Sequence, residues 1–239
     1  MAKASPPAPL LGPAFIRLLA RFGEAGLPRT PPVLTERLAQ WFDWNRAITL
    51  SRALDRRLPE AVDAPNFDAA EDAACARIRR SLLDAIDAEV DLSPPRRREA
   101  AAGIDPGYLP YRQHCLSVQR AMQAATGQLR GHLRDMLARQ SPTKARLAEV
   151  DAVMEATLSP REQALLAIVP TLLGQHFQRL RDAGAPQPTG DATPDDDTPA
   201  IPAGPWLARF RQDMRTALLA ELEVRFHPID GLLAALRTR

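Results

Sequence analysis

The chain has 239 residues, of which 45% are hydrophobic and 25% are charged, and its formal net charge at pH 7 is +2. Such a composition is that of a globular protein long enough to bury a core of its own, with one domain plus tails as the expected organisation. The small charge excludes the strongly basic class of proteins that bind nucleic acid or anionic membranes through charge alone.

The two cysteines and the first residues of the chain indicate where the protein works. Cys75 and Cys115 form neither a C-x-x-C pair nor the spacing of a zinc site, so we expect reduced thiols. The opening segment "MAKASPPAPLLGPAF" has no continuous apolar region, because prolines and a glycine interrupt it. We therefore expect no signal peptide, a flexible tail over residues 1–12 and a cytoplasmic protein.

Apolar residues recur at helical spacing through most of the chain, and no segment alternates as a strand does. The first predicted helix follows Pro13 and contains Phe15, Ile16, Leu18, Leu19 and Phe22. The second begins at Thr35, is interrupted near Asp43, and places in the core Leu38, Trp41, Phe42, Trp44, Ile48, Leu50 and Leu54. The third covers residues 67–90, with an apolar face made of Cys75, Ile78, Leu82, Ile86 and Val90.

The most regular pattern predicts a long helix over about residues 110–140. Its apolar positions follow heptad steps of four and three: Tyr111, Cys115, Val118, Met122, Ala125, Leu129, then His132 or Leu133, then Met136. At 1.5 Å per residue such a helix is about 45 Å long, so we expect an elongated domain. Ser141 and Pro142 begin a further helix, which leads into the next apolar segment.

The longest apolar run, "ALLAIVPTLLG" at residues 164–174, is too short to cross a membrane, which takes about twenty residues. Ser159, Pro160 and Glu162 resemble a capping box, so we predict a helix that starts at Ser159. Pro170 should kink it. Its apolar residues surround most of the helix axis, which predicts a central helix covered on several sides: Leu165, Leu166, Ile168, Val169, Leu172, Leu173, Phe177 and Leu180.

The segment "AGAPQPTGDATPDDDTPAIPAG" has five prolines and four aspartates but no Lys or Arg. It contains too little apolar surface to offset the entropy of ordering, so we predict a disordered linker over residues 184–204. The predicted fold is therefore all-α. It consists of an elongated antiparallel helical bundle over residues 13–183, the flexible acidic proline-rich linker, and a C-terminal amphipathic segment over residues 205–239 that packs on the bundle.

The C-terminal segment carries the candidate binding surface. An apolar residue recurs every four positions at Trp206, Phe210, Met214, Leu218 and Leu222. Charged residues are expected at the sides and back of this helix: Arg209, Arg211, Asp213, Arg215 and Glu221. The apolar face must be covered, either by the bundle or by a partner, and the aggregation risk of a free face favours the bundle. The helix should end near Phe226, because His227 and Pro228 follow, and a short apolar turn should complete the chain.

No motif predicts a catalytic residue, a cofactor or a metal site, and we expect a protein that is not an enzyme. His114 and Cys115 point about 100° apart on a helix and cannot act as a base and nucleophile pair. His114 and His132 stand about 27 Å apart along the helix axis and cannot share a metal. An enzyme would need one of these histidines, or His176, to line a polar pocket with carboxylate or thiol neighbours.

Clustered arginines leave a second function open. Arg96, Arg97 and Arg98, with Arg77, Arg79 and Arg80 upstream, are candidate phosphate contacts of a nucleic-acid-binding module. The few aromatic residues are not interleaved with them, so a solvated helical face is the preferred interpretation and nucleic acid is not the expected partner.

Four segments together resemble an uncharacterised all-helical family of GC-rich Gram-negative bacteria, known only as a domain of unknown function: "GPAFIRLLARF", "ERLAQWFDWNRAITLSRAL", "ALLAIVPTLLGQHFQRL" and "WLARFRQDMRTALLAELEVRFHPIDGLLAAL". The resemblance brings no activity, ligand or catalytic residue. It implies a cytoplasmic accessory to an envelope or stator-like complex. We therefore predict a non-enzymatic helical adaptor or scaffold protein, with another protein as its partner.

Overall fold

The computed structural model of the protein describes residues 14–22, 43–55, 67–90, 105, 107–184 and 204–238. Every regular element in these ranges is an α-helix, which confirms the all-α prediction. The helices are α1 Ala14–Phe22, α3 Trp44–Asp55, α4 Ala69–Asp87, α5 Leu109–Gln140, α6 Pro142–Leu166, α7 Val169–Gly184 and α8 Pro205–Arg237. Among these described helices, none combines the length and apolar character needed to cross a membrane.

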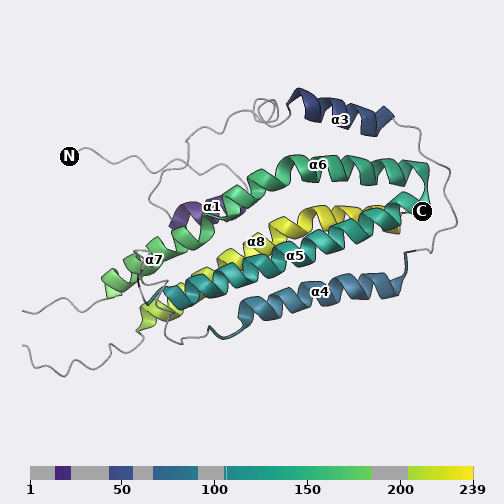
Figure 1. Cartoon of the computed structure of the whole chain (residues 1–239). Helices are drawn as coiled ribbons and strands as arrows, with labels where there is room; N and C mark the ends of the chain where they lie inside the picture. The colour runs from purple at the N-terminus through teal and green to yellow at the C-terminus, as the bar shows by residue number, and fades with distance from the viewer. Residues whose placement is uncertain are drawn as a thin grey trace, which may run out of the picture.

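The long helices lie side by side along a common direction and give the molecule an elongated shape (Figure 1). α5 contacts α8 and α6 most extensively, α4 packs against α5 and α8, and α7 continues from α6 to pack on α8. α1 lies on α7 and α8, and α3 lies on α6. The predicted tail at 1–12 and most of the predicted linker at 184–204 lie outside the described residues.

The core follows one face of α5, whose bounds agree closely with the helix predicted at 110–140. Buried side chains along it include Tyr111, Cys115, Val118, Met122, Leu129, Leu133 and Leu137. Of the two alternatives in the pattern, Leu133 is buried and His132 is exposed. Late in the helix the buried positions move forward by one residue, from Ala125 to Thr126 and from Met136 to Leu137. A straight α-helix drifts by about 20° per heptad from a strict seven-residue repeat, and the shift compensates for that drift.

The helix predicted to start at Ser159 does not exist as a separate element. Instead α6 begins after Ser141, whose hydroxyl accepts a hydrogen bond from the Lys144 backbone N–H at 3.2 Å, and it runs through Ser159 and Pro160. The chain turns at residues 167–168, and Pro170 sits in the first turn of α7, where its missing N–H has no helical partner to lose.

This turn changes which apolar residues are covered. Val169 and Leu173 are buried, whereas Leu165 is 54% exposed and Ile168 is 46% exposed. The prediction that the apolar run would be covered on several sides is therefore wrong for the residues at the turn, because two separate helices meet there and each buries only one face.

α3 also departs from expectation. It begins at Trp44, where Asp43 accepts a hydrogen bond from the Arg46 backbone N–H at 2.8 Å, so the predicted interruption near Asp43 is the start of the helix. Trp44 is 78% exposed and Leu54 is also exposed, contrary to their predicted place in the core. Among the described helices, α3 packs mainly on α6, which covers only a narrow face of it, and Ala53 is the buried residue on that face. Residues 35–42 lie outside the described part of the chain.

The C-terminal helix does not end at His227. α8 continues through Pro228 to Arg237, because the apolar face continues beyond the proline with Ile229, Leu232, Leu233 and Leu236, all buried. A proline inside a helix costs about 3 kcal/mol, and burial of four large aliphatic side chains exceeds that cost. The short separate turn predicted after Pro228 is therefore wrong.

Candidate functional site

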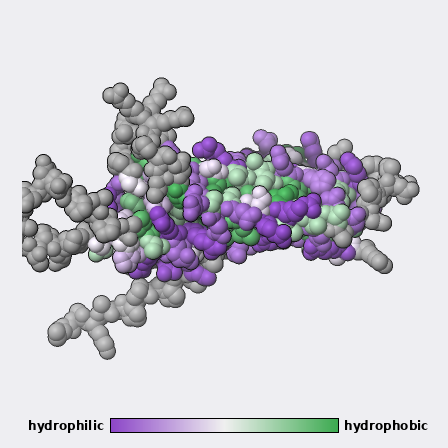
Figure 2. All heavy atoms as spheres, turned by 90° about the horizontal axis from the view of Figure 1, so that it is seen from below, coloured by the Kyte–Doolittle hydropathy of each residue, from purple (hydrophilic) through white to green (hydrophobic). Residues whose placement is uncertain are grey.

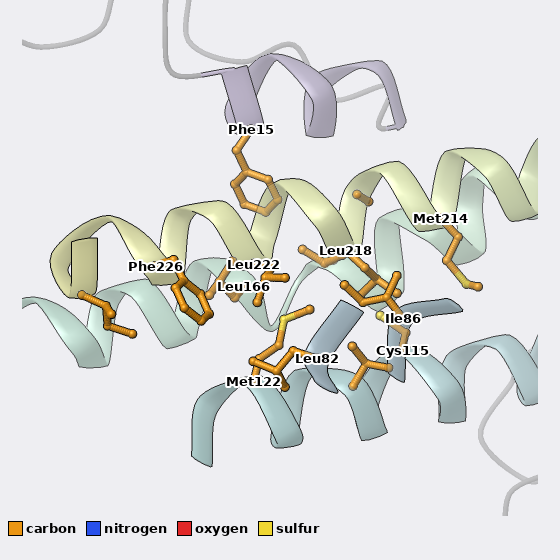
Figure 3. Packing of buried hydrophobic residues seen from close by; sticks show 14 of the residues in the cluster. Phe15, Leu82, Ile86, Cys115, Met122, Leu166, Met214, Leu218, Leu222 and Phe226 are labelled. Atoms are coloured by element: carbon orange, nitrogen blue, oxygen red, sulfur yellow. The ribbon is translucent and has the colours of Figure 1, made fainter. Parts of the chain in front are cut away.

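The face of α8 proposed for partner binding lies inside the molecule. Phe210, Met214, Leu218 and Leu222 are buried, and Trp206 is half-buried against the same core. Figure 3 shows Met214, Leu218 and Leu222 directed toward side chains of α4 and α5. A partner that used this face would have to displace α8 from those helices.

Aromatic contacts fix the N-terminal half of α8. The ring centroid of Phe210 lies 5.0 Å from that of Phe177 and 5.3 Å from that of Tyr111, both in edge-to-face geometry. Trp206 meets Phe177 in the same way at 5.2 Å. Edge-to-face pairs add about 1 kcal/mol each to the area they bury, so this end of α8 is held by α5 and α7 together.

The arginines of the alternative function are only partly described. Arg96, Arg97 and Arg98 lie outside the described residues. Upstream, the Arg79 guanidinium lies 4.9 Å from the centre of the Phe226 ring and 3.8 Å from the Asp230 carboxylate, both on α8. Arg79 therefore joins α4 to α8, whereas Arg77 and Arg80 are exposed.

The three histidines considered as catalytic candidates, His114, His132 and His176, occupy separate environments. His114 Nε2 lies 3.4 Å from the Ile86 carbonyl and borders a pocket of about 430 Å³ with Arg211, Arg215 and Asp87. The Arg215 guanidinium donates two hydrogen bonds to Asp87, at 2.6 and 3.0 Å, and these bonds lower the pKa of that carboxyl. Asp87, one of the two acidic residues that line this pocket, is thus already engaged by an arginine.

The other two histidines pair with carboxylates. His132 Nε2 lies 3.3 Å from Glu71 on the surface. His176 of α7, at the edge of the core, lies 2.8 Å from Asp213 of α8, and its ring centroid lies 4.8 Å from that of Phe22 of α1, with the two rings tilted by 41°. These two contacts join α7 to α8 and α1, so His176 has a structural role in positioning α1.

Both cysteines are buried and unpaired. Burial, and secondly the negative charge of Glu221, raises the pKa of the Cys115 thiol to about 12. A thiol with such a pKa stays protonated at neutral pH and does not act as a nucleophile.

The sequence prediction missed a polar cluster in the core. Glu221, expected at the side or back of α8, has no exposed surface. Its Oε1 accepts hydrogen bonds from Arg225 Nε and Nη2 at 3.0 and 2.8 Å, and its Oε2 accepts one from Gln119 Nε2 at 2.8 Å. Gln119 Nε2 also donates to the Leu166 carbonyl at the end of α6, at 3.0 Å.

Spacing along α8 could have placed Glu221 and Arg225, though not Gln119, on the buried side. Leu218, Glu221 and Arg225 are related by steps of three and four, so they lie on one side of α8 together with Met214. Because Glu221 and Arg225 are charged, the sequence favours placing them at the surface. They can be buried only because Gln119 of α5 provides a hydrogen-bonding partner in the core.

A polar cavity of about 200 Å³ adjoins the cluster, between α5, α6 and α8. Arg225 borders it from α8, Gly127 and Arg130 from α5, and Glu155, Ser159 and Glu162 from α6. Arg130 is held by Asp151 through two hydrogen bonds of 2.8 and 2.7 Å. Within the described part of the chain, no group of three or more His, Cys, Asp or Glu side chains is arranged to hold a metal ion.

Comparison with known proteins supports the resemblance found in the sequence. No curated protein and no solved structure shows significant similarity to the chain. A family model does match, over residues 1–238, so the chain belongs to the family described as protein of unknown function (DUF3348).

Proposed function

We propose that the protein is a non-enzymatic helical adaptor or scaffold in a bacterial cytoplasmic or envelope-associated assembly, with another protein as its partner. One observation carries the proposal. The large apolar side chains that the described part of the chain leaves exposed all belong to α3, α6 and the turn after α6: Trp44, Leu54, Leu147, Leu165 and Ile168.

Exposed apolar residues that gather on one side of a protein are typical of a binding surface, whereas single scattered ones need no explanation. Leu147 and Leu165 lie 18 residues apart on α6, which is five helical turns, so they share one face of that helix at a separation of about 27 Å. A partner helix with an apolar face fits such a length, and an exposed tryptophan is the residue type that most often anchors an interface.

The face seen from below carries hydrophilic side chains over much of its surface, and hydrophobic atoms appear along the middle of the body (Figure 2). We assign partner binding to the α3 and α6 side because the exposed large apolar residues of the described chain belong to α3, α6 and the turn after α6, whereas the apolar face of α8 is buried in the core. This replaces the α8 residues Trp206, Phe210, Met214, Leu218 and Leu222 as the proposed contact surface.

Co-purification from the native cell tests the proposal. We compare the wild type with Leu165→Lys and Ile168→Lys, which change exposed positions and should leave the melting temperature unchanged. Ala234→Lys is the matched control, because Ala234 is also an exposed helical position but lies on α8. The wild type and the control should recover one protein in near-stoichiometric amount, and the two turn variants about tenfold less.

Three results would contradict the proposal. The wild type could emerge alone at both low and moderate salt. All variants could recover the same partner equally. Finally, nucleic acid could be recovered in place of protein, with a steep loss as salt rises, which is the behaviour of the arginine-dependent alternative.

A further inference from the structure

We propose that the polar cavity between α5, α6 and α8 is a binding site for a small zwitterion of the amino-acid class. This inference concerns a different part of the molecule from the α3 and α6 surface and does not depend on the proposed adaptor function. It is based on three independent features of the cavity wall.

The first feature is that two of the three helices carry a residue unfavourable to helices at the cavity. Gly127 lies in the middle of α5 and Pro228 lies inside α8, while Ser159, which borders the cavity from α6, precedes Pro160 within that helix. A glycine in a helix interior costs about 1 kcal/mol relative to alanine, and a proline about 3 kcal/mol. A Cβ atom at Gly127 would meet no atom within 4 Å, so tight helix packing does not explain the glycine, and its lack of a side chain leaves the cavity open on the α5 side.

The second feature is a positively charged group held in a fixed orientation. Glu221 is fully buried and binds two nitrogens of the Arg225 guanidinium, while Gln119 fixes the other carboxylate oxygen. A buried ion pair contributes little net stability compared with an apolar pair of the same size. The arrangement instead preorganises a binding group, because Glu221 orients the Arg225 guanidinium before any ligand arrives.

The third feature is a pair of opposite charges, Arg225 and Glu162, in the wall of the cavity. The remaining Arg225 nitrogen, Nη1, lies 4.0 Å from Glu162 Oε1, which is too far for a hydrogen bond. Arg130 and Glu155, by contrast, are engaged with Asp151 and Arg134. Arg225 and Glu162 are therefore the charged groups most available to a ligand.

An α-amino acid matches this pair. Its carboxylate and its ammonium group are attached to one carbon, so the carboxylate can accept from Arg225 Nη1 while the ammonium donates to Glu162. The cavity volume of about 200 Å³ exceeds the roughly 150 Å³ that accommodates benzene in an engineered apolar cavity, so alanine and serine fit by size. Ser159, beside Glu162 on α6, can bond a polar side chain.

Isothermal titration calorimetry on the full chain tests the inference, with L-alanine and L-serine as probes. Acetate and methylammonium, which each carry one of the two charges, are the controls. We expect a saturable heat with a Kd of about 1 mM for the zwitterions and at least about tenfold weaker binding for the single ions.

Two variants locate the site. Gly127→Leu fills the cavity from α5 and should abolish the heat. Gly231→Leu is its matched control, because Gly231 is also an exposed helical glycine whose Cβ would meet open space, but it does not border the cavity. Glu162→Gln removes the charged partner of the ligand's ammonium group and should weaken binding about tenfold. If Gly127→Leu does not fold, Glu162→Gln is the variant that locates the site.

The inference is overturned if neither zwitterion gives a saturable heat, which would indicate a water-filled cavity. It is also overturned if acetate binds as tightly as alanine, or if Gly127→Leu and Glu162→Gln bind as the wild type does. Loss of binding in Gly127→Leu and Glu162→Gln, with binding retained in Gly231→Leu, supports it.

Discussion

Glu221 is the residue whose environment is most unusual. It places a carboxylate in the core, where an isolated charge would cost several kcal/mol, and Arg225 and Gln119 offset that cost through three hydrogen bonds. The three side chains therefore act as a unit. Removal of one of the two charged side chains should lower the free energy of unfolding by more than removal of both.

A double-mutant cycle tests this coupling. Glu221→Leu leaves the buried Arg225 charge without its main partner and should lower the free energy of unfolding by about 3–5 kcal/mol. The double variant Glu221→Leu, Arg225→Met should recover most of that loss, because no charge remains buried there. Urea denaturation of the two single variants and the double variant measures the coupling, and simple additivity of the single effects would contradict it.

Cys115 gives a second prediction at this scale, because burial and the nearby Glu221 charge raise the pKa of its thiol from 9.0 to about 12. The unfolded chain loses the thiol proton first as pH rises. The thiol's contribution to stability is therefore complete below about pH 9 and is lost progressively as the pH approaches 12.

The comparison is between the wild type and Cys115→Ala. Above about pH 9 the free energy of unfolding of the wild type should fall more steeply, by up to about 1.4 kcal/mol per pH unit. Chemical denaturation at several pH values measures both slopes. Parallel slopes would show that the thiol is not held protonated by the fold.

At the scale of helices, a close approach holds α7 against the start of α5. The Tyr108 hydroxyl donates a hydrogen bond to the Pro170 carbonyl, and its ring packs directly over Gly174. A Cβ atom at Gly174 would lie 2.9 Å from Tyr108 Cε1. Because the ring is buried and its hydroxyl is engaged, it has little freedom to move away.

Gly174→Ala should therefore destabilise the protein by about 1–3 kcal/mol, although the same substitution in an open helix stabilises it. Gly231→Ala is the matched control and should raise the melting temperature, because space is open around it. Thermal unfolding followed by circular dichroism measures both. A rise in melting temperature for both variants would mean that α7 does not approach Tyr108 this closely.

Periodicity predicted the helices well where one face is continuously apolar, as in α4 and α5. It failed where the local sequence resembles a helix boundary but packing favours a continuous helix. Two pairs of residues have this effect, Ser159 with Pro160 in α6 and His227 with Pro228 in α8. Tertiary contacts keep both helices continuous there. Trp44 is exposed because α3 has α6 as its neighbour, and a single sequence does not reveal how many neighbours a helix has.

The candidate site was less accessible from the sequence. Its polar residues come from α5, α6 and α8, which are up to about a hundred positions apart: Gln119 to Glu221 spans 102 residues. No local spacing connects them. Each looked like an ordinary surface residue until the helices that carry them were placed together.

At the scale of the whole molecule, α8 is the element that unites the others. It contacts α1, α4, α5 and α7, and its apolar face completes the core that those helices leave open. Much of the core therefore depends on residues 205–237 being in place. With the apolar face of α8 buried, the partner surface that we propose lies on the α3 and α6 side.

Hydrogen–deuterium exchange of the full chain, followed by mass spectrometry, tests this arrangement most directly. If α8 is closed onto the bundle, amides of residues 214–226 should exchange as slowly as those of residues 115–133 in α5, because both belong to one cooperative core. Exchange of residues 214–226 at the rate of an isolated helix, with α5 still protected, would contradict the account. The apolar face of α8 would then be free for a partner.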